Sequence, residues 1–159
     1  MRNIPLLSTL AAALFAFSTP AHAWWEYAKW GMTAQQLATA SKGAARPCEG
    51  STECSPPIGK SSPSMIAKDV RAADLPAKAL FDFDDQGRLR ATLIVFGSKA
   101  IIKVNEALAA AYGAPASIEN SWPATRLWRD PAKGTTIKSW SFPDSNTILV
   151  EYRPIAKGL

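Results

Sequence analysis

Turn signals divide the second half of the chain into short, strand-length pieces, and they constrain its fold more than any other feature. Asp84-Asp85-Gln86-Gly87 suits a type I turn followed by a glycine bulge, so it predicts a hairpin over residues 79–96. Asp130-Pro131 and Pro143-Asp144-Ser145-Asn146 mark two later turns. The resulting meander has expected strands at about 125–129, 135–142 and 147–153.

The first hairpin has a predicted register. Pairing outward from Asp84 opposite Arg88 sets Asp82 opposite Arg90. One face is then apolar, with Phe81, Phe83, Leu89, Ala91, Leu93 and Val95. The other face carries opposite charges across the strands, each pair worth a few tenths of a kcal/mol. The same segment resembles a calcium loop only superficially, because Leu93 stands where the bidentate glutamate belongs.

Capping signals predict two helices. Thr33 as N-cap with Gln36 at N3 forms a capping box, and Gly43 ends a helix over about 34–42. Ser98 begins the second helix, which ends at Gly113. Its apolar stripe is Ile101, Val104, Leu108 and Ala111. A weak strand signal lies at about 65–71.

Together these elements predict an α+β fold in which two short helices are each followed by antiparallel strands. The strands form one sheet layer with the helices on one face, and the two halves echo one layout. Residues 24–159 are expected to form a single domain, which is enough chain to bury one core.

The N-terminus predicts export. Arg2 precedes an apolar stretch at 6–17, and Ala21-His22-Ala23 gives the small-x-small pattern of a cleavage site, so residues 1–23 read as a signal peptide. Twelve helical residues span about 18 Å, short of the ~30 Å of a bilayer core. We expect a periplasmic or secreted protein without a stable membrane anchor, cleaved near Ala23.

Two cysteines lie in the Pro/Gly/Ser-rich segment 44–64. In an oxidising compartment Cys48 and Cys54 are expected to form a disulfide that holds this loop. The alternative is a redox pair, but the spacing is C-x5-C rather than C-x-x-C.

Histidine content restricts catalysis. The single histidine, His22, lies in the segment expected to be removed, which excludes Ser-His-Asp and Cys-His mechanisms and imidazole metal sites. Most carboxylates fall in turns or opposite basic residues, so we expect no enzyme, cofactor or metal. The net charge is +5, but the basic residues are scattered, which argues against nucleic-acid binding.

Three segments carry a resemblance to known proteins. WGMTAQQL at 30–37, LFDFDDQGRL at 80–89 and AYGAP at 111–115 resemble exported envelope domains of the SmpA/OmlA outer-membrane lipoprotein type. The tandem layout is similar to the β-lactamase-inhibitor-protein fold. The resemblance covers about a third of the chain and implies a non-enzymatic module that binds another envelope protein. The chain departs from that family in lacking a lipidated cysteine and in having the disulfide loop.

The last hairpin supplies a candidate binding face. Its four-residue turn sets Phe142 opposite Thr147 and Trp140 opposite Leu149. The better core candidates alternate with them: Ile137, Ile148, Val150 and Tyr152. If helices cover only one face, the other exposes Trp140, Phe142, Leu149 and, with them, Trp128.

Three interpretations of that face remain open. Its aromatic side chains are typical anchors for a protein partner. Alternatively, Trp128 and Trp140 stack on carbohydrate or peptidoglycan, with Arg126 and Arg129 as polar partners. They are core residues instead if the sheet is covered on both faces or if the segment 24–30 covers them. A register slip of one residue would also exchange the two faces.

Overall fold

The computed structural model describes residues 27–56, 62–97 and 99–156. The expected signal peptide and its cleavage site lie outside these residues. The helices and strands follow in the order α1 (Ala34–Ala40), β1 (Arg46–Pro47), α2 (Gly50–Glu53), β2 (Met65–Ala72), β3 (Leu75–Phe83), β4 (Leu89–Phe96), α3 (Ile101–Tyr112), β5 (Ser117–Glu119), β6 (Ala124–Asp130), β7 (Thr135–Phe142), η1 (Pro143–Ser145) and β8 (Thr147–Pro154). The fold is α+β, as predicted.

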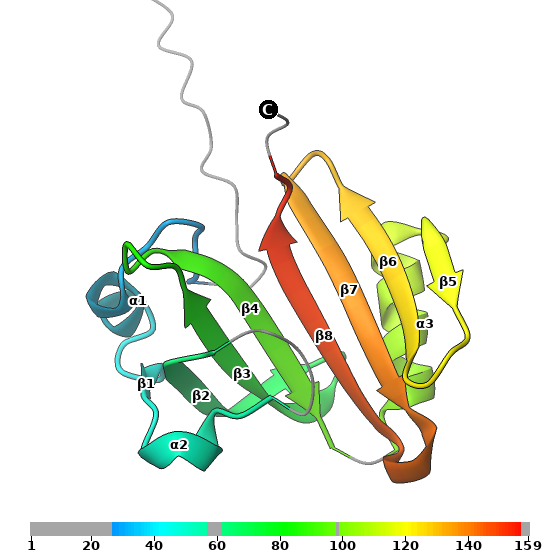
Figure 1. Ribbon diagram of the computed structural model, residues 1–159, viewed down its shortest axis with the longest axis horizontal. Coiled ribbons are helices and arrows are strands. Elements are labelled where there is room, and N and C mark those ends of the chain that lie inside the picture. Colours follow the sequence, from blue (N-terminus) through cyan, green and yellow to red (C-terminus); the bar gives the residue numbers. More distant parts are fainter. Residues whose placement is uncertain (1–26, 57–61, 98, 157–159) are drawn as a thin grey trace, which may run out of the picture.

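The eight strands of the described residues belong to one antiparallel sheet of order β1-β2-β3-β4-β8-β7-β6-β5 (Figure 1). Each half of the molecule is a meander preceded by a helix. The halves meet where β4 pairs with β8, over Thr92–Phe96 and Ile148–Tyr152. The meander at 124–154 confirms the three strands expected there, and β2 confirms the weak signal near residue 65.

Local signals fix the ends of α1. The Thr33 hydroxyl accepts from Gln36 N–H at 3.2 Å, and Thr33 N–H donates to the Gln36 side chain at 2.9 Å, so the capping box is confirmed. At the other end Lys42 takes the left-handed conformation and Gly43 N–H donates to the Ala38 carbonyl. Helix α1 therefore ends at Ala40, two residues earlier than predicted. Gly43 is the second residue after the C-cap Ser41, in a Schellman-type ending.

The β3–β4 hairpin contains a bulge that the turn signal at 84–87 does not predict. Phe83 pairs with Leu89 as predicted, but Asp82 then pairs with Ala91 instead of Arg90. One extra residue on a strand turns all the following side chains to the other face. The predicted apolar face is therefore wrong beyond this point, because Ala91, Leu93 and Val95 lie on the face opposite Phe81.

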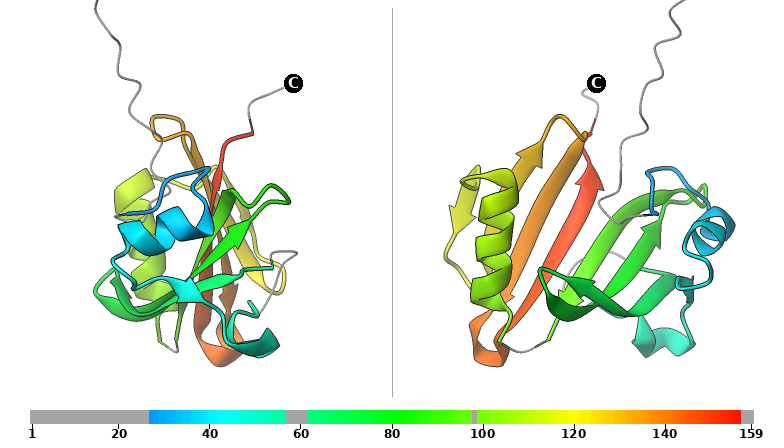
Figure 2. Two further views of the ribbon diagram at one scale, coloured as in Figure 1. Left: turned by 90° about the vertical axis from the view of Figure 1, so that its left-hand side faces the viewer. Right: turned by 180° about the vertical axis from the view of Figure 1, so that it is seen from behind.

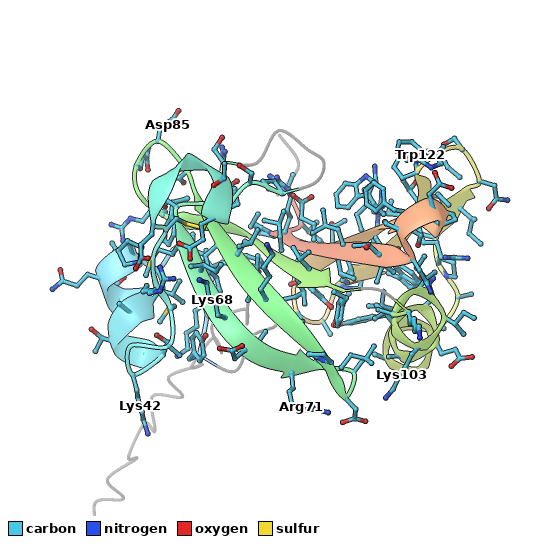
Figure 3. All side chains as sticks on the ribbon, turned by 90° about the horizontal axis from the view of Figure 1, so that it is seen from below. Lys42, Lys68, Arg71, Asp85, Lys103 and Trp122 are labelled. Atoms are coloured by element: carbon cyan, nitrogen blue, oxygen red, sulfur yellow. A yellow bond between two sulfur atoms is a disulfide. The ribbon has the colours of Figure 1, made fainter. Side chains whose placement is uncertain are left out.

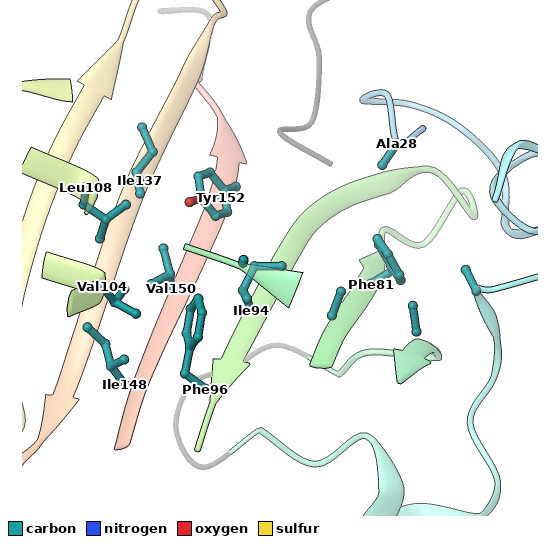
Figure 4. Packing of buried hydrophobic residues seen from close by; sticks show 14 of the residues in the cluster. Ala28, Phe81, Ile94, Phe96, Val104, Leu108, Ile137, Ile148, Val150 and Tyr152 are labelled. Carbon is teal, nitrogen blue, oxygen red and sulfur yellow. The ribbon is translucent and has the colours of Figure 1, made fainter. Parts of the chain in front are cut away.

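Helices α1 and α3 lie on the same side of the sheet, as predicted, and α2 lies on the other (Figures 2 and 3). We call the side of α1 and α3 the helix face and the opposite side the open face. The helix face holds the larger core, where Leu37 of α1 and Val104 and Leu108 of α3 pack on the strands (Figure 4). Ala100 is the N-cap of α3, and the expected cap Ser98 is outside the described residues.

The described part of the segment 44–64, residues 44–56 and 62–64, has more regular structure than the loop we expected. It contains β1 and α2, which Cys48 and Cys54 join through a disulfide with a Cα–Cα distance of 6.0 Å. Both cysteines pack against an apolar cluster on the open face, which includes Ile66 and Leu80. The disulfide thus anchors α2 over the first half of this face. No helix of the described ranges is long and apolar enough to cross a membrane.

Candidate functional site

The register of the last hairpin is the predicted one. Phe142 pairs with Thr147, and Trp140 pairs with Leu149. These residues therefore lie on the open face. The alternating residues lie under α3 in the main core: Ile137, Ile148, Val150 and Tyr152.

Exposure on the open face differs from the expectation. Leu149 is fully buried, Phe142 is 7% exposed and Trp140 is half-buried. The reason is a second apolar cluster, in which Phe142 and Leu149 pack with residues of the first half: Cys54, Ile66, Leu80, Ala91 and Leu93. The centre of the open face is therefore a second packed apolar layer. Leu149 is a core residue of this layer rather than a contact residue.

Trp128 does not belong to the candidate face. It pairs with Ile137 across β6 and β7, so its side chain points to the helix face, where it is 1% exposed. Its indole N–H donates to the carbonyl of Gly113 at the end of α3, at 3.0 Å. The expectation that Trp128 joins the binding face is therefore wrong. The turn at 130–134 does not by itself specify the register of β6, which decides the face on which Trp128 lies.

A different tryptophan extends the face. Trp122, in the connection between β5 and β6, is 68% exposed, and its ring stands edge-on to Phe142 with 5.9 Å between centroids. In Figure 3 it lies on the side of the sheet opposite Lys103 of α3. The sequence contains a signal for this exposure in Asn120-Ser121-Trp122-Pro123. The tryptophan there stands in a polar turn, outside any pattern of alternating apolar residues that would place it on a buried strand face. We call Trp122, Trp140 and Phe142 the aromatic patch.

Charged side chains of both signs border the aromatic patch. The Lys138 ammonium lies over the Trp140 ring, 5.2 Å from its centroid, which is a cation–π geometry. Lys138 pairs across the strands with Glu151, and Glu151 forms an ion pair with Arg153 at 2.8 Å. Because the acidic Glu151 lies between the basic Lys138 and Arg153, neither positive nor negative charge dominates this border.

The remaining predicted polar residues are divided between the faces. Arg129 pairs with Thr136 and lies on the open face, whereas Arg126 pairs with Ser139 and lies on the helix face. The ion pair predicted between Asp82 and Arg90 of the first hairpin is also present, with 3.0 Å between Arg90 Nε and Asp82 Oδ2, although the bulge places Asp82 opposite Ala91.

The open face therefore offers one exposed tryptophan, Trp122, edge-on to the buried ring of Phe142, with the half-buried Trp140 on the same face and a mixed-charge border. Within residues 27–56, 62–97 and 99–156, no three His, Cys, Asp or Glu side chains are grouped so that they could hold a metal ion. The chemistry available at the patch is apolar contact, ring stacking and ion pairing. Comparison of the chain with family models, with curated proteins and with solved structures finds no match.

Proposed function

We propose that this protein is an exported, non-enzymatic module that binds another envelope protein through the aromatic patch. The observation that carries the proposal is the 68% exposure of Trp122 beside Phe142. A large indole left in solvent yet supported by a second ring loses little side-chain freedom on binding. Tryptophans of this kind are frequent hot spots of protein interfaces.

A protein partner fits the patch better than a glycan does. A sugar-binding site needs flat aromatic rings with an open face, and the Trp140 ring already has Lys138 over it. Trp140 is also half-buried, so Trp122 is the one indole of the patch that is mainly exposed. Of the two arginines that would assist a sugar, Arg126 lies on the helix face.

Export is supported by two features. Residues 1–23 have the pattern of a signal peptide. The Cys48–Cys54 disulfide is of a kind that persists in oxidising compartments such as the periplasm. The resemblance to SmpA/OmlA-type domains agrees with a place in the bacterial envelope.

The test is crosslinking capture from native periplasm with the mature protein and with Trp122→Ala. We expect the variant to keep wild-type stability and to bind the captured partner about 30-fold more weakly, which corresponds to the ~2 kcal/mol of a hot spot. Ile102→Ala is the matched control, because Ile102 is 74% exposed on α3 and lies away from the patch. It should bind as the wild type does.

Two results would contradict the proposal. Capture that survives Trp122→Ala would remove the patch from the interface. Retention of the wild type on purified peptidoglycan sacculi, lost in Trp122→Ala, would show a glycan-binding protein instead.

A further inference from the structure

A small cavity lies on the helix face, away from the aromatic patch. Its volume is about 90 Å³, and it lies between α3 and the strands β4 and β8, with the β2–β3 turn at one end. Figure 4 shows part of its wall, with Val104 and Leu108 of α3 facing Val150 and Phe96. The cavity is partly open to solvent, so a ligand can enter it.

Small residues leave this space unfilled. On α3 the wall is formed in part by Ala107 and Ala111, and at the turn by Ala72 and Ala73. The β2–β3 turn belongs to the first half of the molecule and α3 to the second. The cavity therefore marks a place where the two halves approach without packing fully against each other.

The turn itself is held in a fixed shape. Ala73 and Asp74 both have positive φ, at 49° and 57°, as a two-residue type I′ turn requires. Arg71 Nη2 donates to the Asp74 carbonyl at 2.8 Å and braces this conformation. The turn therefore has a defined conformation where Ala72 and Ala73 line the cavity.

The lining restricts the chemistry of a ligand. None of the lining residues is charged, and the only polar side-chain groups are the hydroxyls of Tyr112 and Tyr152. Burial raises the pKa of both phenols, so both remain neutral at physiological pH. A charged group inside the cavity would lose its hydration without a counter-charge.

We propose that this cavity binds the end of an alkyl chain. An engineered apolar cavity of about 150 Å³ binds one benzene molecule, which has six carbons, so a cavity of about 90 Å³ accommodates about three or four carbons. The polar end of the ligand remains at the open mouth. The ligand class is a small amphiphile with an unbranched apolar tail.

The test uses a series of primary alcohols from ethanol to octanol with the ¹³C-methyl-labelled mature protein. The methyl signals of Val104, Leu108 and Val150 should shift and saturate, while that of Leu37 in α1 should not. Affinity should rise about fourfold for each methylene buried and level off at three or four carbons. 1,4-Butanediol, which would place a hydroxyl in the apolar interior, should bind much more weakly than 1-butanol.

Matched variants locate the site. Ala107→Leu fills the cavity and should abolish the saturating shifts, whereas Ala110→Leu makes the same change at an exposed position of α3 and should leave them. Ala111→Val is the smaller change to use if Ala107→Leu does not fold. Shifts that persist in the folded filled variant, or an affinity that rises without levelling off, would overturn the proposal.

Discussion

At the scale of single residues, Glu53 lies at the centre of a group of charged contacts. Its carboxylate accepts two hydrogen bonds from Arg46, at 2.6 and 3.1 Å, and lies 2.6 Å from the Lys68 ammonium. These donors, with the backbone N–H of Glu49, hold the pKa of Glu53 well below its usual range. The three side chains join β1, α2 and β2, so the charge of Glu53 helps to hold the disulfide segment against the sheet.

The consequence is a pH-dependent contribution to stability. The pKa of Glu53 is depressed in the folded state and is about 4.3 in an unfolded chain. Its contribution is therefore complete above about pH 5 and is lost as the pH falls below 4.3 towards the folded value. We expect Glu53→Gln to lower the free energy of unfolding at pH 7, and we expect the difference from the wild type to shrink between pH 5 and pH 2.

Urea denaturation at a series of pH values measures this difference. The control is Glu49→Gln, because the Glu49 side chain is 80% exposed and lies 3.4 Å from Arg46, so it should change stability little at any pH. A Glu53→Gln penalty that stays constant down to pH 2 would contradict the assignment.

Residue-level signals were predictable when they acted within a few residues. The Thr33–Gln36 capping box and the turn after Phe142 depend on local geometry, and both are present. The side on which Trp128 lies depends on pairing between distant strands, which no local signal specifies. For the same reason the burial of Leu149 was not predictable, since its neighbours come from the other half of the chain.

At the scale of elements, the two hairpins show when the alternation of side chains along a strand correctly predicts the face of the sheet on which each residue lies. The last hairpin has a regular ladder from Phe142–Thr147 to Thr135–Pro154, so its faces followed from the turn. In the β3–β4 hairpin a bulge next to the turn exchanged the faces of β4. Bulges leave a weak trace in sequence because the strand stays apolar on both sides, as β4 does here.

The short elements of the disulfide segment depend on their crosslink. Helix α2 has four residues and no side-chain cap, which is too short to be stable alone. We expect the double variant Cys48→Ser, Cys54→Ser to unfold with a free energy about 2 kcal/mol lower, because the small ring no longer restricts the unfolded chain. Denaturation curves measure the loss.

Reduction provides the matched control. Reductant should lower the stability of the wild type to that of the double variant and leave the variant unchanged. A double variant as stable as the oxidised wild type would mean that the Glu53 ion pairs alone hold this segment.

At the scale of the whole molecule, the two halves share one core. One connected cluster on the helix face contains buried residues of both halves, among them Leu37 of the first half and Ile137 of the second. The segment before α1 adds a second link, because it pairs with Leu89 of β4 and Trp30 Nε1 donates to Thr135 of β7 at 3.4 Å. A tandem layout of this kind therefore does not imply two independent units.

We therefore expect the halves to unfold together. Leu37→Ala and Ile137→Ala each remove a fully buried aliphatic side chain and should each lower the free energy of unfolding by about 2–5 kcal/mol. In a urea titration followed by amide NMR, the folded signals of Ala79 in β3 and Trp128 in β6 should disappear at one common midpoint in each variant. Ile102→Ala, on the exposed side of α3, should leave that midpoint near the wild-type value. If Leu37→Ala melts Ala79 while Trp128 stays folded, the β4–β8 ladder does not couple the halves and each meander is a separate folding unit.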